Sequence, residues 1–90
     1  MKKLVLLANT TQRDVWLGEA AMAGAKVSAT GLRVTRVNGN EEQGHIVTGD
    51  QKAAVQWLTG QVYDEIDVSR LQPVAGEALQ DALRLCLRSA

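Results

Sequence analysis

The sequence predicts a small α+β domain in which strands and helices alternate as βαββαβ, followed by one more helix at the C-terminus. Three observations lead to this prediction. Short runs of apolar and β-branched residues recur between stretches with helical periodicity. Residues 44–60, GHIVTGDQKAAVQWLTG, indicate a strand, a tight turn at Gly49 and a helix that Asp50 caps. Residues 74–88 carry the strongest helical pattern, because leucines line one side and charges the other.

The length and charge of the chain restrict its class. Ninety residues make a single domain, residues 1–90, with a core so small that self-association would help to stabilise it. Ten basic and ten acidic residues cancel, and no basic run could follow a phosphate backbone, so we expect no nucleic-acid partner. No apolar stretch approaches membrane-spanning length, so we expect no membrane partner. A single cysteine fits a reducing, cytoplasmic compartment.

The first half of the chain predicts two strands separated by a helix. Residues 4–8 are continuously apolar, which is typical of a strand buried in mid-sheet. A helix capped by Thr10 or Thr11 then extends to about residue 25. Residues 27–37, VSATGLRVTRV, are rich in β-formers and predict one second strand with a bulge at Gly31.

The second half predicts the remaining elements. Asn38-Gly39 suits a hairpin turn, and polar residues up to Gly44 lengthen the connection to a third strand at residues 45–48. A helix at residues 51–59 and a strand at residues 62–68 come next, and Pro73 separates this strand from the last helix. Right-handed crossovers place both inner helices on one face of a four-stranded antiparallel sheet. We therefore expect a ferredoxin-like sandwich with an added C-terminal amphipathic helix.

The chain lacks the residue patterns of catalytic and metal sites. His45 is the only histidine, which excludes a His-pair metal site or a His-based triad within one chain. Cys86 falls on the apolar face of the last helix, where a thiol is inert. Strand alternation sends Asp64 to the face opposite Glu65 and Asp67, so these acids do not form a cation site. We expect no enzyme activity, no cofactor and no metal.

Two polar segments have alternative interpretations. Asn9-Thr10-Thr11 leads from a strand into a helix N-terminus, where capping and anion binding are both possible roles. Glu41 and Glu42 are adjacent in the predicted connection, where they serve either loop solubility or a functional loop at an oligomer axis.

Several short motifs resemble the shell domain of bacterial microcompartments. Residues 19–27, EAAMAGAKV, are similar to the Ala-Met-rich helix of that family, and residues 49–55, GDQKAAV, to its turn-helix motif. The segment IDV at residues 66–68, ahead of Pro73, is similar to its last strand. The resemblance implies a non-enzymatic, homo-oligomeric structural protein that forms flat hexamers. Its partners would be further copies of itself and other shell or enzyme subunits.

The same resemblance and the helix pattern assign functional residues. In the shell family a small pore is lined by the loop before the third strand, which here comprises Gly39, Asn40, Glu41, Glu42, Gln43 and Gly44. On the first helix, apolar residues on the outer face predict an oligomer contact, which we assign to Val15, Glu19, Met22 and Lys26.

A second hypothesis is a small regulatory or metabolite-binding module. The βαββαβ order also resembles the ACT and nitrogen-regulatory signalling families, which bind small molecules between the subunits of a dimer or trimer. Such a site would place the Asn9-Thr10-Thr11 turn beside a neighbouring subunit. A metabolite-dependent melting temperature is expected of this module, whereas ligand-free assembly is expected of a shell subunit.

Overall fold

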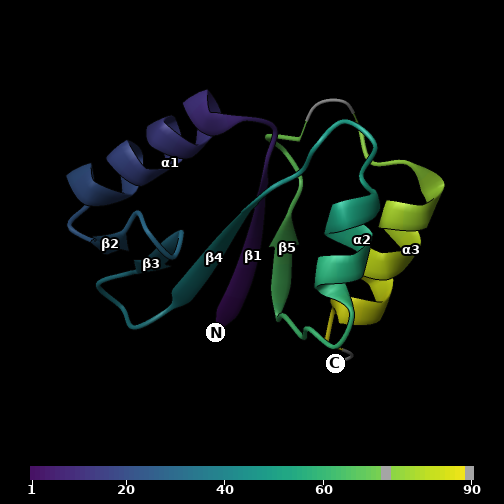
Figure 1. Cartoon of the computed structure of the whole chain (residues 1–90). Coiled ribbons are helices and arrows are strands. Elements are labelled where there is room, and N and C mark those ends of the chain that lie inside the picture. The colour runs from purple at the N-terminus through teal and green to yellow at the C-terminus, as the bar shows by residue number, and fades with distance from the viewer. Residues whose placement is uncertain (72–73, 89–90) are drawn as a thin grey trace.

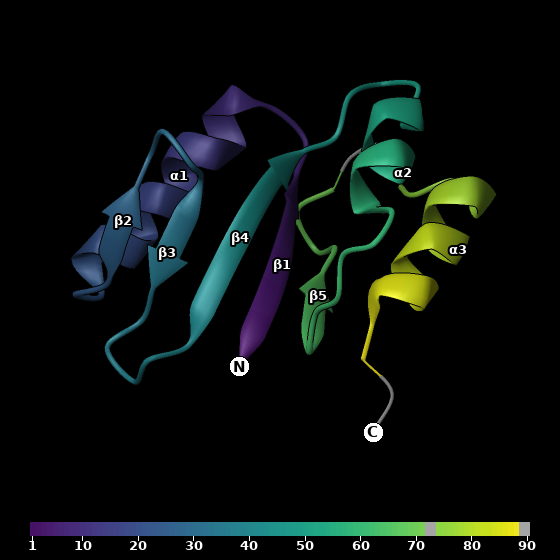
Figure 2. The same cartoon turned by 60° about the horizontal axis from the view of Figure 1, so that its bottom comes forward.

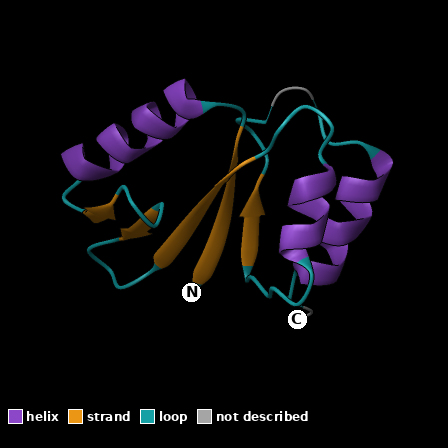
Figure 3. Ribbon diagram, in the orientation of Figure 1, coloured by secondary structure: helices purple, strands orange, loops and turns teal. Residues whose placement is uncertain are grey.

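A computed structural model describes residues 1–71 and 74–88 of the chain. Within these residues it contains five strands in one open sheet and three helices (Figures 1 and 3). In chain order the elements are β1 (Lys2–Leu7), α1 (Thr10–Met22), β2 (Lys26–Ser28), β3 (Arg33–Thr35), β4 (Glu41–Ile46), α2 (Lys52–Leu58), β5 (Glu65–Asp67) and α3 (Glu77–Cys86). The predicted α+β class is confirmed. Pro73, which we expected between the last strand and the last helix, lies outside the described residues.

The sheet is mixed, with the order β2-β3-β4-β1-β5. Strand β1 is parallel to both of its neighbours, β4 and β5. Strand β3 is antiparallel to β2 and to β4. The expected four-stranded antiparallel sheet of a ferredoxin-like fold is therefore wrong.

The difference arises within residues 27–37. Instead of one bulged strand, this region is a hairpin in which β2 and β3 pair, with Val27 opposite Val34. The chain reverses over the turn at residues 29–32, and Leu32 has a φ of 47°, in the left-handed region that closes tight turns. This additional reversal makes β4 run parallel to β1, whereas a single strand would have made it antiparallel.

The parallel direction of β4 also decides where the helices lie. The crossover from β1 to β4, which includes α1, moves toward the β2 edge of the sheet. The crossover from β4 to β5, which includes α2, moves back toward the opposite edge. Because parallel crossovers are right-handed, opposite directions place the two helices on opposite faces. Figure 2 shows α1 behind β2 and β3, with α2 and α3 beside β5. The expectation that both inner helices share one face is wrong.

Alternate residues of β1 supply two separate cores, and Leu4 to Leu7 are all buried as expected for a central strand. The α1 face buries Val5, Leu7, Trp16, Leu17, Ala20 and Val34. The α2 and α3 face buries Leu4, Leu6, Val47, Ala54, Leu58, Tyr63, Leu71, Leu79, Leu83 and Cys86. Each helical layer lies over only part of its face of the sheet (Figures 1 and 2).

The start of α2 differs from the expected cap. Gln51, and not Asp50, is the N-cap, and it has a φ of 61°. Asp50 still contributes, since its Oδ1 accepts from the Lys52 amide at 3.2 Å. The Gln51 side chain binds the start of α3: its Oε1 accepts from the Gly76 amide at 2.8 Å, and its Nε2 donates to the Val74 carbonyl at 3.3 Å. Gln51 thereby joins the two helices.

Candidate functional site

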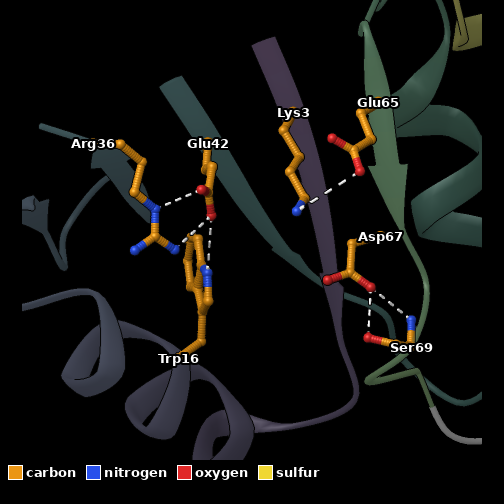
Figure 4. A network of polar contacts seen from close by, with 7 residues as sticks. All are labelled: Lys3, Trp16, Arg36, Glu42, Glu65, Asp67 and Ser69. Carbon is orange, nitrogen blue, oxygen red and sulfur yellow. Dashed lines mark hydrogen bonds and ion pairs between the residues drawn. The ribbon is translucent and has the colours of Figure 1, made fainter. Parts of the chain in front are cut away.

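A polar cluster around Trp16 attaches α1 to β4 (Figure 4). The indole ring lies on Gly44, where an added Cβ would come within 2.5 Å of a ring carbon. The indole Nε1 donates to Glu42 at 3.4 Å. Arg36 donates to the same carboxylate through Nε at 2.6 Å and through a terminal nitrogen at 3.1 Å. The glycine at position 44 is therefore required for the helix to approach the strand.

The buried carboxylate of Glu42 accepts hydrogen bonds from Arg36 and Trp16. The hydrogen bond from Arg36 holds the pKa of Glu42 below its ordinary value, against the opposing effect of burial. The same hydrogen bond raises the pKa of Arg36. A carboxylate that is fixed as an anion in this way is a poor proton donor or acceptor near neutral pH. The cluster is structural, and it offers no catalytic acid or base.

Beyond the edge of α1, the same face of the sheet presents charges to solvent. Lys3 Nζ lies 4.0 Å from Glu65, and Arg70 forms an ion pair with Glu19 of α1 at 3.0 Å. Burial alone would raise the pKa of Asp67, but hydrogen bonds from the hydroxyl and amide of Ser69 outweigh it, and the pKa is lowered. Exposed ion pairs of this kind contribute little stability.

On the opposite face, the part of the sheet that α2 leaves open contains a hollow of about 430 Å³. It is lined by Lys2, Arg33, Val34, Thr35, Glu41, Glu42, Gln43, Trp57, Gln61 and Tyr63. Among the residues that the structure describes, Lys2 and Arg33 make no ion pair. The Lys2 ammonium lies 5.2 Å from the centroid of the Tyr63 ring. The polar residues that line this hollow can bind hydrogen-bonding groups, but they do not form a pair of nucleophile and base.

His45 lies near this hollow and stacks on Trp57, with ring centroids 4.1 Å apart and planes 10° from parallel. Burial lowers the pKa of His45, so the imidazole is neutral at neutral pH. The structure gives the histidine a packing partner on α2, which supports a structural role for it.

The N-terminus of α1 is closed by its own side chains. Asn9 Oδ1 accepts from the Gln12 amide at 2.9 Å, and Gln12 Oε1 accepts from the Ala8 amide at 3.1 Å. The N-cap is Asn9, whereas we expected Thr10 or Thr11. Capping therefore accounts for the polarity of this turn.

The residues assigned to a pore loop do not form a loop. Glu41 to Gly44 belong to β4, and only Gly39 and Asn40 lie in the connection before it. The side chain of Glu42 is buried under α1, and Gly44 is covered by Trp16. The expected polar extension is wrong because the segment pairs with β1 on one side and β3 on the other.

The residues assigned to an oligomer contact do lie on the surface. Val15 is 52% exposed and Met22 is 91% exposed. Glu19 and Lys26 are also exposed, although Glu19 forms the ion pair with Arg70. Val37, which the sequence did not indicate, is 81% exposed and lies beside the turn at Gly24, two residues after Met22. Its position between a strand and a turn gave no periodic signal.

The arrangement of the potential metal ligands and of the one cysteine can be described within residues 1–71 and 74–88. Within residues 1–71 and 74–88, no group of three or more histidine, cysteine, aspartate or glutamate side chains could hold a metal ion. Cys86 is buried, its pKa is raised by burial, and its thiol donates to the Leu58 carbonyl at 3.1 Å. Among the helices of the described residues, none combines the length and the apolar character needed to cross a bilayer.

Comparison with known proteins adds no assignment, because no family model, no curated protein and no solved structure matches the chain.

Proposed function

We propose that this protein is a non-enzymatic structural protein that acts by associating with further copies of itself. The observation that carries the proposal is the apolar surface at the end of the molecule formed by α1 and β2. Met22, two residues before Gly24, is 91% exposed, and Val37, whose side chain lies beside Gly24, is 81% exposed. Val27, on the open edge of the sheet, is 37% exposed. We define these three side chains, Met22, Val27 and Val37, as the apolar end.

Physical chemistry supports an interface at the apolar end. A chain of 90 residues buries a modest share of its surface, so large apolar side chains gathered at one end are a cost that an interface would remove. Burying one such side chain contributes about 1.5–3 kcal/mol. Met22 was one of the residues from which the sequence predicted a contact, and Lys26, another, is next to Val27.

The proposal is narrower than the expectation from the shell-domain resemblance. That expectation combined self-association with a hexamer and a pore, and it came with a ferredoxin-like sheet that this chain does not have. We therefore propose self-association without the hexameric pore. The single buried cysteine is consistent with the cytoplasmic location that we propose for the protein.

The test is the native mass of the purified chain and of two matched variants. Val37→Lys places a charge at the apolar end. Val74→Lys places a charge elsewhere, before α3, at a side chain that is 80% exposed compared with 81% for Val37. In sedimentation across a range of concentrations, Val37→Lys should weaken association about tenfold or more. Val74→Lys should leave association unchanged. A parent chain that sediments as a monomer at every concentration would overturn the proposal.

A second candidate function is binding of a small polar molecule in the sheet hollow. The specific observation is that the hollow contains two cations, Lys2 and Arg33, without ion-pair partners among the described residues. Thermal melting with a panel of small phosphates and carboxylates tests this function. A stabilising ligand whose effect is lost in Arg33→Ala would support it, and a melting temperature that no compound moves would exclude binding of that panel.

A further inference from the structure

Both edge strands of the sheet, β2 and β5, have no described strand on their outer side. Near β5, the end of α3 and the residues after it pair with Tyr63, which lies two residues before that strand: the Tyr63 amide donates to the Cys86 carbonyl, and the Arg88 amide donates to the Tyr63 carbonyl, each at 2.7 Å. No such pairing is present beside β2 within the described residues. All three residues of β2 are exposed. An open strand of this kind is a template for pairing with another strand.

The side chains at the two edges also differ in how they would meet a second copy. If β5 paired with itself about a two-fold axis at Ile66, Glu65 of each copy would lie opposite Asp67 of the other. Like charges directly opposite one another destabilise a strand pair. If β2 paired with itself about Val27, Lys26 would lie opposite Ser28, which brings no like charges face to face.

The face of the sheet on which Val27 lies also favours β2, rather than β5, as the strand that pairs with a second copy. Val27 is opposite Val34, and directly opposed residues of an antiparallel pair share a face. Val34 packs in the core under α1, so Val27 is on the α1 side of the sheet. A two-fold axis at Val27 would therefore bring the two copies of Val27 together on the side where Met22 ends α1.

We infer that two copies of this chain join through β2 in an antiparallel, two-fold pair centred on Val27. The result is one continuous sheet with five strands from each copy. Such an interface is isologous, because the same patch serves both partners, and it closes at a dimer. This inference rests on the proposed self-association and specifies its geometry.

Single cysteines on β2 test the register directly. Opposed residues of an antiparallel pair have Cα atoms about 4.5–5.5 Å apart, which is within the range that a disulfide spans. Diagonal neighbours are about 7–8 Å apart, which a disulfide does not span without backbone movement. Val27→Cys should therefore form a covalent dimer on mild oxidation. Lys26→Cys alone and Ser28→Cys alone should not, but an equal mixture of the two should cross-link.

The parent chain is the control, because its only cysteine, Cys86, is buried and should give no cross-linked dimer. The outcomes separate the inference from the proposed function. A parent that self-associates while Val27→Cys cross-links no faster than the two flanking variants would overturn the β2 pairing and leave self-association in place. A parent that stays monomeric, with no cross-linking in any variant, would overturn both.

Discussion

Replacing Gly44 with alanine tests the attachment of α1 to the sheet. The new methyl group would lie 2.5 Å and 2.9 Å from two carbons of the Trp16 ring, and 3.3 Å from a methyl carbon of Leu7. The first two distances are shorter than carbon–carbon contact allows. Trp16 is itself buried between helix and sheet, so the ring cannot move without displacing α1.

The expected cost comes from overpacking of a dense core. Extra methyl groups in such cores destabilise by about 1–3 kcal/mol. For a domain of this size, each kcal/mol lowers the melting temperature by about 4–8 °C. We therefore expect Gly44→Ala to melt roughly 4–24 °C below the parent. The movement of the indole should also weaken its hydrogen bond to Glu42.

A matched control and a double mutant make the prediction specific. Gly18, in α1, has no atom within 4 Å of an added Cβ, so Gly18→Ala should stabilise the protein by about 0.5–1 kcal/mol. Trp16→Phe removes the part of the ring that the methyl group would meet. In a thermal-melting cycle, Gly44→Ala should therefore cost less in the Trp16→Phe background than in the parent. Equal costs in the two backgrounds would refute the clash as the cause.

Four further perturbations test individual contacts in the structure. Glu42→Gln should lower the free energy of unfolding by about 1.5–3 kcal/mol at pH 7. Because the pKa of Glu42 is lowered in the folded protein, the difference in stability between parent and variant should disappear as pH falls below about 4. A difference that does not change with pH in denaturant titrations would contradict this. Gln51→Ala should cost more than Gln51→Gly, since both lose the bonds to α3 but only glycine relaxes the positive φ; chemical denaturation showing the reverse order would count against strain at that residue. Trp57 fluorescence should change with a midpoint below about pH 6.5 as the stacked His45 is protonated, and a midpoint above that value would exclude the burial effect. Leu83→Asp should leave the chain insoluble or unfolded, because Leu83 is in the core beside α2, and an unchanged circular dichroism melt would show that α3 does not dock.

The sequence predicted the elements better than it predicted their connections. All three helices overlap the predicted segments, and so do the strands at residues 2–7 and 65–67, which were predicted at residues 4–8 and 62–68. The failure came at Gly31, where a bulge and a tight turn have the same signature: one glycine within a β-rich run. The turn here depends on a positive φ at Leu32, which a leucine seldom adopts and no propensity rule anticipates. One unrecognised reversal changed the direction of β4, and with it the face of α2.

The candidate surfaces were predictable only in part. Met22 was identified because a helix has a period, and a large apolar residue off the buried stripe is visible in the sequence. Val37 and the sheet hollow could not be identified from the sequence, because each depends on segments that only the folded chain brings together, such as Gly24 beside Val37. Residues 41–44 were expected in a loop, but they belong to β4, and Glu42 is polar yet buried there. Its partners Arg36 and Trp16 are six and 26 residues away, so the sequence does not mark them as a pair.

The central position of β1 has a consequence for how the protein is made. Strand β1 leaves the ribosome before the other elements described here, but its neighbours are β4 and β5, and β5 begins only at Glu65. Until most of the chain has been translated, the buried run from Leu4 to Leu7 therefore lacks its full set of sheet neighbours. Such a segment is a binding site for chaperones and a starting point for aggregation. The yield of folded protein should accordingly depend on how quickly the remainder of the chain emerges after β1.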